Sequence, residues 1–216
     1  MQEIASHAVR AQSVGRAWDD GERATQNNDM TALAAARDKL RKLGATEESN
    51  RLVRAKTKEL VIRASVFDAQ GYRAAGAEQK ILQNQAAKLY RQALQLDPDF
   101  SSPHPDLLNQ IGYFLADKGQ SKSDFMLAEK LTRRALAGIE NKDANAFSVA
   151  SDAMQRANTR DSLAWALFRQ GRFAEALREQ RQAVKEAESL TQDDDELREL
   201  RSHLRQIEQA AASTAN

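Results

Sequence analysis

The chain has 216 residues, of which 41% are hydrophobic and 29% are charged, a balance typical of one globular domain or two small ones. Its net charge of +1 provides no overall field for nucleic acid or an anionic membrane, and the absence of cysteine excludes disulfides, thiolate chemistry and thiolate metal sites. With 38 alanines, nine glycines and three prolines, the composition predicts an all-α fold.

The first residues lack the apolar run of a signal peptide, because Glu3, His7 and Arg10 interrupt them. No stretch approaches the roughly 18–20 apolar residues of a membrane span. We therefore expect a soluble chain that works in the cytoplasm, or in the periplasm if a signal peptide has been removed.

Apolar residues at helical spacing predict a first helix that includes residues 4–18 and a second that includes residues 33–43. Asp29 is the expected N-cap of the second helix, and Gly44 is its expected end. A third helix is predicted from Thr46 to about residue 75, because anionic residues follow Thr46 and suit the positive end of a helix dipole.

Glycines and prolines predict where the next helices end. Gly71 and Gly76 should end or bend the third helix. All three prolines lie in one short window, which separates two long stretches free to be helical. The window contains Pro98, Pro103 and Pro105.

The last predicted helix has the clearest amphipathic pattern. Its apolar stripe alternates steps of three and four, and the acidic residues 193–195 precede it at the end that the dipole favours. The stripe consists of Leu197, Leu200, Leu204, Ile207 and Ala211. We expect this helix to cover the end of the structure and residues 211–216 to be frayed.

Three segments share small residues two helical turns apart, at residues 86–98, 127–138 and 171–184. Such residues let a neighbouring helix approach closely. The pairs are Ala86 and Ala93, Ala128 and Ala135, and Ala176 and Ala183.

These segments resemble tetratricopeptide repeats. The third is the best match, with Leu163, Ala164 and Leu167 on a first helix, a turn at 171–173 and the two alanines on a second helix. The first segment has the closing Asp97-Pro98 of the family and its mid-helix aromatic, Tyr90. Thr132 and Gln180 replace that aromatic in the other two segments, and the alanines recur after 42 and 48 residues instead of about 34. Part of the surplus, residues 146–157, itself has a helical pattern.

The resemblance implies antiparallel helix hairpins stacked as a short tetratricopeptide-like α-solenoid. We expect an N-terminal helical segment over residues 1–76, the hairpins over 77–190, and a C-terminal covering helix with its tail over 191–216. The first helix of each hairpin would line a groove that binds a partner. The groove residues would be Asn109, Tyr113, Asp117, Asp161, Trp165, Phe168 and Arg169. The alternative for Trp165 and Phe168 is a place in the core.

Motifs that carry chemistry are missing from the sequence. The three histidines, His7, His104 and His203, have no metal-binding spacing, and no phosphate-binding loop or nucleophile elbow occurs. We therefore expect no metal, no cofactor and no enzymatic activity.

The first 98 residues have a basic bias, with 16 Lys and Arg against 12 Asp and Glu. Arg51, Arg54 and Lys58 share one helix face, and residues 37–42 add four more cations. Such a cluster could bind phosphates, or it could be the solvated side of two amphipathic helices.

The sequence thus predicts a non-catalytic scaffold for protein–protein interaction, with a peptide or protein segment bound in a helical groove. The alternative is nucleic-acid binding by the basic N-terminal helices. A third hypothesis is a helical enzyme or a structural subunit whose partner chain supplies the chemistry. Self-association through an exposed solenoid end is a further expectation.

Overall fold

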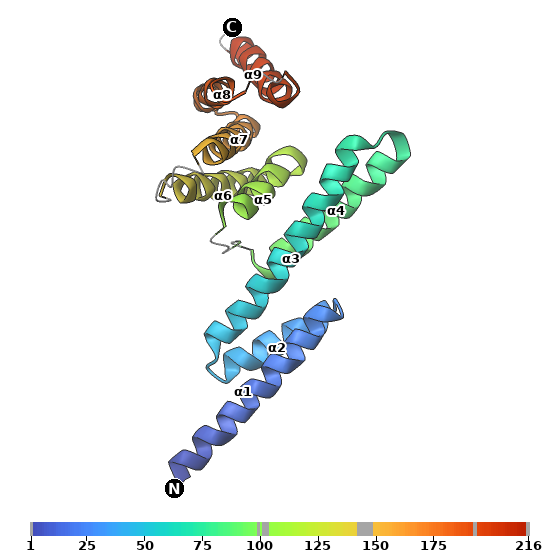
Figure 1. Ribbon diagram of the computed structural model, residues 1–216, viewed down its shortest axis with the longest axis vertical. Helices are drawn as coiled ribbons and strands as arrows, with labels where there is room; N and C mark the ends of the chain where they lie inside the picture. The colour runs from blue at the N-terminus through green and yellow to red at the C-terminus, as the bar shows by residue number, and fades with distance from the viewer. Residues whose placement is uncertain (1, 99, 101–103, 142–148, 192–193, 215–216) are drawn as a thin grey trace. The chain divides into compact units, whose positions relative to one another are not determined.

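The computed structural model describes residues 2–98, 100, 104–141, 149–191 and 194–214, and all of its regular elements in these ranges are helices. Nine helices lie in the described residues (Figure 1). They are α1 Gln2–Gln26, α2 Met30–Lys42, α3 Thr46–Arg73, α4 Gly76–Leu96, α5 Pro105–Lys118, α6 Lys122–Glu140, α7 Val149–Arg169, α8 Phe173–Glu188 and α9 Asp194–Thr214. The all-α prediction is confirmed.

Local signals fix several helix ends. The side chain of Asp29 accepts hydrogen bonds from the first backbone N–H groups of α2, and Gly44 follows that helix with a φ of 73°, as predicted. Pro105 stands in the first turn of α5, where a missing N–H costs nothing. Ser121 and Asp124 form a reciprocal capping box at the start of α6. These ends follow from a few neighbouring residues and were therefore readable from the sequence.

The chain divides into two compact units. The N-terminal unit consists of Met1–Arg63 and Arg91–Ser101, and the C-terminal unit consists of Ala64–Tyr90 and Ser102–Asn216. Helices α3 and α4 therefore contribute residues to both units, and the division falls inside these helices.

In the N-terminal unit, α1 packs against α2 and against the first half of α3. Leu33, Leu40 and Leu60 are fully buried in it. Lys56 is also buried, and its ammonium donates to the carbonyl oxygen of Thr25 at 3.1 Å and to the carboxylate of Glu59 at 2.9 Å. A charge in this position is tolerated because both partners compensate for its lost hydration.

In the C-terminal unit, consecutive helices from α5 to α9 pack on one another, and α5 also contacts α7. Leu163 and Leu167 of α7, Leu136 of α6 and Ile207 of α9 lie in one core cluster, and α9 contacts both α7 and α8. Helix α9 continues through Thr214, and the predicted fraying of residues 211–214 is wrong; residues 215–216 lie outside the described residues.

The alanine pairs found in the sequence lie at the helix contacts. All six alanines at these positions are fully buried, and α6 and α8 each carry one of the pairs. Thr132 and Gln180, which replace the family's mid-helix aromatic, are fully buried as well. The methyl group of Thr132 lies against Gly112 of α5, so the small residue allows α5 and α6 to come close together.

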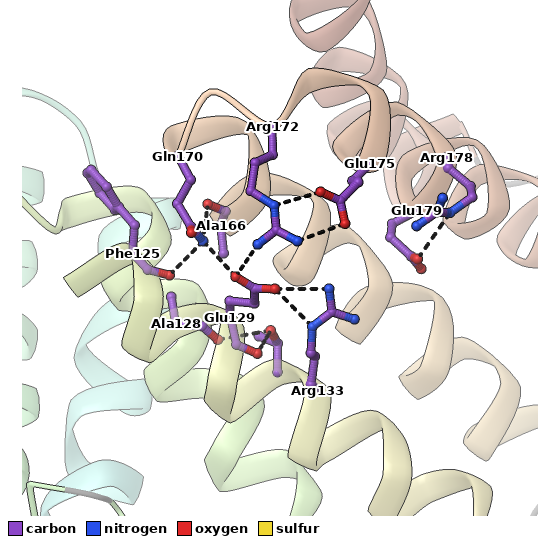
Figure 2. A network of polar contacts seen from close by, with 11 residues as sticks. Phe125, Ala128, Glu129, Arg133, Ala166, Gln170, Arg172, Glu175, Arg178 and Glu179 are labelled. Atoms are coloured by element: carbon purple, nitrogen blue, oxygen red, sulfur yellow. Dashed lines mark hydrogen bonds and ion pairs between the residues drawn. The ribbon is translucent and has the colours of Figure 1, made fainter. Parts of the chain in front are cut away.

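The turn between α7 and α8 is held against α6 by the polar network in Figure 2. Its centre is the Glu129 carboxylate, which accepts from Gln170 at 3.0 Å, Arg172 at 2.6 Å and Arg133 at 2.9 Å. Burial alone would raise the pKa of Glu129, but these three donors lower it below its ordinary value. Gly171 allows the turn itself, with a φ of 76°.

The surplus segment 146–157 is helical from Val149, where it forms the start of α7; residues 146–148 lie outside the described residues. Within the described ranges, no helix combines the length and the apolar character needed to cross a bilayer.

Candidate binding pocket

A pocket of about 430 Å³ opens in the C-terminal unit and is lined by one face each of α5, α7 and α9, with Tyr72 from the end of α3. We call it the central pocket. Its lining residues lie at helical spacing, which places them on a common face of each helix. They are Tyr72, Asn109, Gln110, Tyr113, Met154, Asn158, Asp161, Ser162, Glu199 and Leu200.

Tyr113 and Glu199 face each other across the central pocket. The Tyr113 hydroxyl donates to the Glu199 carboxylate at 2.6 Å and thereby connects α5 with α9. Burial, followed by the negative charge of Glu199, raises the pKa of Tyr113 far above its ordinary value. The phenol therefore stays protonated and keeps donating at any physiological pH.

Asp161 is fixed in the wall by two donors. Its carboxylate accepts from Gln180 Nε2 at 2.6 Å and from His203 Nδ1 at 2.9 Å, while Gln180 also donates to the carbonyl oxygen of Leu200 at 2.9 Å. Because a carboxylate faces Nδ1, that nitrogen carries the hydrogen. Burial lowers the pKa of His203, but the hydrogen bond and the charge of Asp161 outweigh burial and raise it above 6.5.

Two oxygens in the wall have no partner. The side-chain oxygens of Asn109 and Gln110 are buried, and neither has a hydrogen-bond partner within the described part of the chain. A buried oxygen in this state costs about 1–3 kcal/mol relative to a bonded one. A donor brought to these oxygens would recover this cost.

A smaller pocket of about 180 Å³ adjoins the central pocket and shares Tyr72, Tyr113 and Glu199 with it. We call it the side pocket. Its further lining includes the carboxylates of Asp68 and Asp117. Burial raises the pKa of Asp68, although a hydrogen bond from Tyr90 opposes the shift.

A cavity of about 540 Å³ lies between α1 and α2 in the N-terminal unit, and it is a weaker candidate for a binding site than the central pocket. Asp20 in its wall is already paired with Arg23 at 2.6 Å and with Lys39 at 3.8 Å, and Asp29 caps α2. We therefore build the candidate site on the central pocket.

The predicted groove residues have two different surroundings. Asn109, Tyr113 and Asp161 line the central pocket, and Asp117 lines the side pocket. Trp165 is only 8% exposed, and its ring lies 4.8 Å from that of Phe168 and 4.4 Å from that of His203. Phe168 in turn packs on the core cluster around Leu163 and Leu167.

Arg169 caps the C-terminal end of α5. Its guanidinium donates to the carbonyl oxygens of Ala116, Asp117 and Gly119 at 2.9–3.1 Å and lies 4.4 Å from the ring centre of Phe125. A cation at this position satisfies the free carbonyls of a helix C-terminus. The structure therefore uses Arg169 for capping, and Trp165 and Phe168 for packing.

Several pocket residues could not be identified from sequence patterns. The amphipathic pattern puts Glu199 on the solvent-exposed face of the last helix, and nothing in the pattern distinguishes it from the other charged residues of that face. Tyr72 lies at the end of α3, far along the chain from the other aromatics of the pocket, and no local pattern connects them.

Several cations of the basic N-terminal helices have partners within the N-terminal unit. Arg51 lies over the ring of Trp18 at 5.4 Å. The ion pairs are Arg54 with Glu47, Arg37 with Asp38 at 3.1 Å, and Lys39 with Asp20. These pairs are typical of the solvated side of amphipathic helices.

A scan against protein-family models and searches of the curated proteins and the solved structures found no match to this chain. The resemblance to tetratricopeptide repeats therefore depends on the alanine spacing and the hairpin pattern alone. Among the described residues, no three His, Asp or Glu side chains converge as a metal site requires.

Proposed function

We propose that this chain is a non-catalytic scaffold that binds a peptide or protein segment in the central pocket, as part of a tetratricopeptide-like stack of hairpins. The observation that carries the proposal is the pair of buried oxygens of Asn109 and Gln110 in the pocket wall. Peptide N–H groups and donor side chains are suitable partners for them.

The other polar groups of the pocket favour binding over catalysis. The Ser162 hydroxyl donates to the carbonyl oxygen of Asn158 at 3.0 Å, within its own helix. His203 and Asp161 hold α7 and α9 together, and Tyr113 and Glu199 satisfy each other. A nucleophile aligned with a base, as covalent catalysis needs, is not among the described lining residues.

The test is a selection of displayed random peptides on the full chain, followed by affinity measurement with Asn109→Ala and Gln110→Ala. Each substitution should weaken the selected peptides about fivefold, because one hydrogen bond is lost. It should leave the unbound protein at least as stable as before, since an unsatisfied oxygen has been removed.

Gln209→Ala is the matched control, because Gln209 is exposed on α9 and does not line the pocket. Selected peptides that bind all three variants equally would show that the central pocket is not the site. A selection that yields no binder would contradict the scaffold proposal as a whole.

A further inference from the structure

Two buried hydrogen-bond acceptors stand out in the lining of the central pocket. Its two buried atoms without a partner in the described residues are both oxygens. The hydroxyls of Tyr113 and Ser162 have already donated, to Glu199 and to the carbonyl oxygen of Asn158. A ligand that brings donors therefore suits these acceptors.

The charges of the lining residues also favour a ligand that carries donors, because they favour a cation. Asp161 and Glu199 line the central pocket, and Asp68 and Asp117 line the side pocket that joins it. The one Lys or Arg among the described lining residues of the two pockets is Lys118, and its ammonium is paired with Asp117 at 2.8 Å. A cation placed at the pocket would therefore interact favourably with these carboxylates.

Shape distinguishes between the two cationic side chains. An arginine guanidinium is planar and carries five N–H donors in a fixed fork, which can reach carboxylate and amide oxygens at the same time. Its flat face also stacks on aromatic rings, and Tyr72 and Tyr113 provide such rings at the pocket. A lysine ammonium offers only a compact point charge.

We infer that the central pocket takes an arginine side chain of the bound peptide segment, with its guanidinium against the Glu199 carboxylate and beside the side chains of Asn109 and Gln110. This inference rests on the proposed function and names the class of segment that the scaffold would bind. The occupant is thus a basic peptide rather than an acidic or purely apolar one.

The probes are labelled random-sequence peptide pools that hold arginine, citrulline or glutamate at one fixed central position. Citrulline keeps the shape of arginine and removes its charge. Fluorescence anisotropy with the full chain should show that the arginine pool binds about tenfold more tightly than the citrulline pool. The glutamate pool should bind most weakly.

Glu199→Gln should reduce the advantage of the arginine pool about fivefold, because one exposed carboxylate is neutralised. Glu208→Gln is the matched control on the same helix, where Glu208 is exposed and pairs with Arg181 at 3.1 Å outside the pocket. It should leave the advantage unchanged.

The outcomes separate the two proposals. Equal binding of all three pools, still weakened by Asn109→Ala, overturns the arginine preference and leaves the scaffold standing. An arginine advantage that Glu199→Gln and Glu208→Gln reduce alike overturns the placement in this pocket. Absence of binding by every pool overturns both proposals.

Discussion

Asp161 joins neighbouring helices and also forms part of the wall of the central pocket. Asp161 is only 5% exposed, yet it lines the central pocket, and its carboxylate is fixed by Gln180 from α8 and His203 from α9. The wall of the pocket is therefore preorganised by the same contacts that join three helices, and a ligand need not order it.

The His203–Asp161 pair should make stability depend on pH. Since the pKa of His203 is raised in the folded protein, its contribution is fully present below the ordinary value of 6.5 and is lost as pH rises through the folded-state value. We expect the free energy of unfolding in urea to fall above pH 6.5 with a slope of at most about 1.4 kcal/mol per pH unit for this one proton.

His203→Gln should remove this slope, whereas His7→Gln should keep it, because His7 is exposed on α1. Urea titrations followed by circular dichroism at several pH values measure both variants. A slope that survives His203→Gln would show that another group produces it.

Of the residues that the resemblance to tetratricopeptide repeats pointed to, Asn109, Tyr113 and Asp161 line the central pocket. The resemblance selected them by helix face, and a helix face is what local spacing can indicate. Trp165 lies on the same helix and yet packs against His203, because a large ring gains more from burial between α7 and α9 than from exposure to solvent. Whether Trp165 packs in this way depends on His203, which is 38 positions away in the chain, and no local sequence pattern indicates that contact.

The contact between α5 and α6 depends on Gly112. A β-carbon added at this position would lie 2.6 Å from the Thr132 methyl group, well inside van der Waals contact. Gly112→Ala should therefore lower the free energy of unfolding by about 1–3 kcal/mol, since the two helices must move apart. Thr132→Ser removes that methyl group and should recover part of the loss in the double variant.

Gly15→Ala is the opposite case and the control, because nothing lies within 4 Å of the added carbon in the exposed part of α1. It should stabilise the protein by up to about 1 kcal/mol, through helix propensity alone. Thermal or urea unfolding of the four variants provides the comparison. A Gly112→Ala protein as stable as the wild type would show that α5 and α6 adjust without cost.

Helix positions were predictable because they depend on local signals such as Asp29, Gly44 and Thr46. The register between helices was only partly predictable. The alanine pairs indicated which faces pack, but the match of Gly112 with Thr132 joins two helices through side-chain volumes, which a periodicity does not encode.

The division of the whole chain into units was not readable from the sequence. Helices α3 and α4 run without a break from one unit into the other, so neither composition nor punctuation changes at the division. The boundary expected at residue 76 followed from where the repeat-like segments begin, and Gly76 starts α4 with a φ of 62°. Unit boundaries follow from long-range contacts, and local glycine signals mark only the ends of helices.

Charge at the scale of the whole molecule leads to the last prediction. The net charge is +1, and several of the cations in the basic first half pair with carboxylates of their own unit. Phosphate binding would have to displace these carboxylates, and little counterion release would remain to drive it. We expect no binding of duplex DNA or single-stranded RNA at micromolar protein, even at about 50 mM salt.

An anisotropy titration at about 50 and 200 mM salt tests this expectation. Binding that weakens steeply between the two salt concentrations would support the nucleic-acid alternative. The variant with Arg41→Glu and Lys42→Glu locates such binding, because both residues are exposed at the end of α2. Loss of binding in that variant would assign it to the basic helices, and the peptide pocket would then be a second site on a nucleic-acid-binding protein.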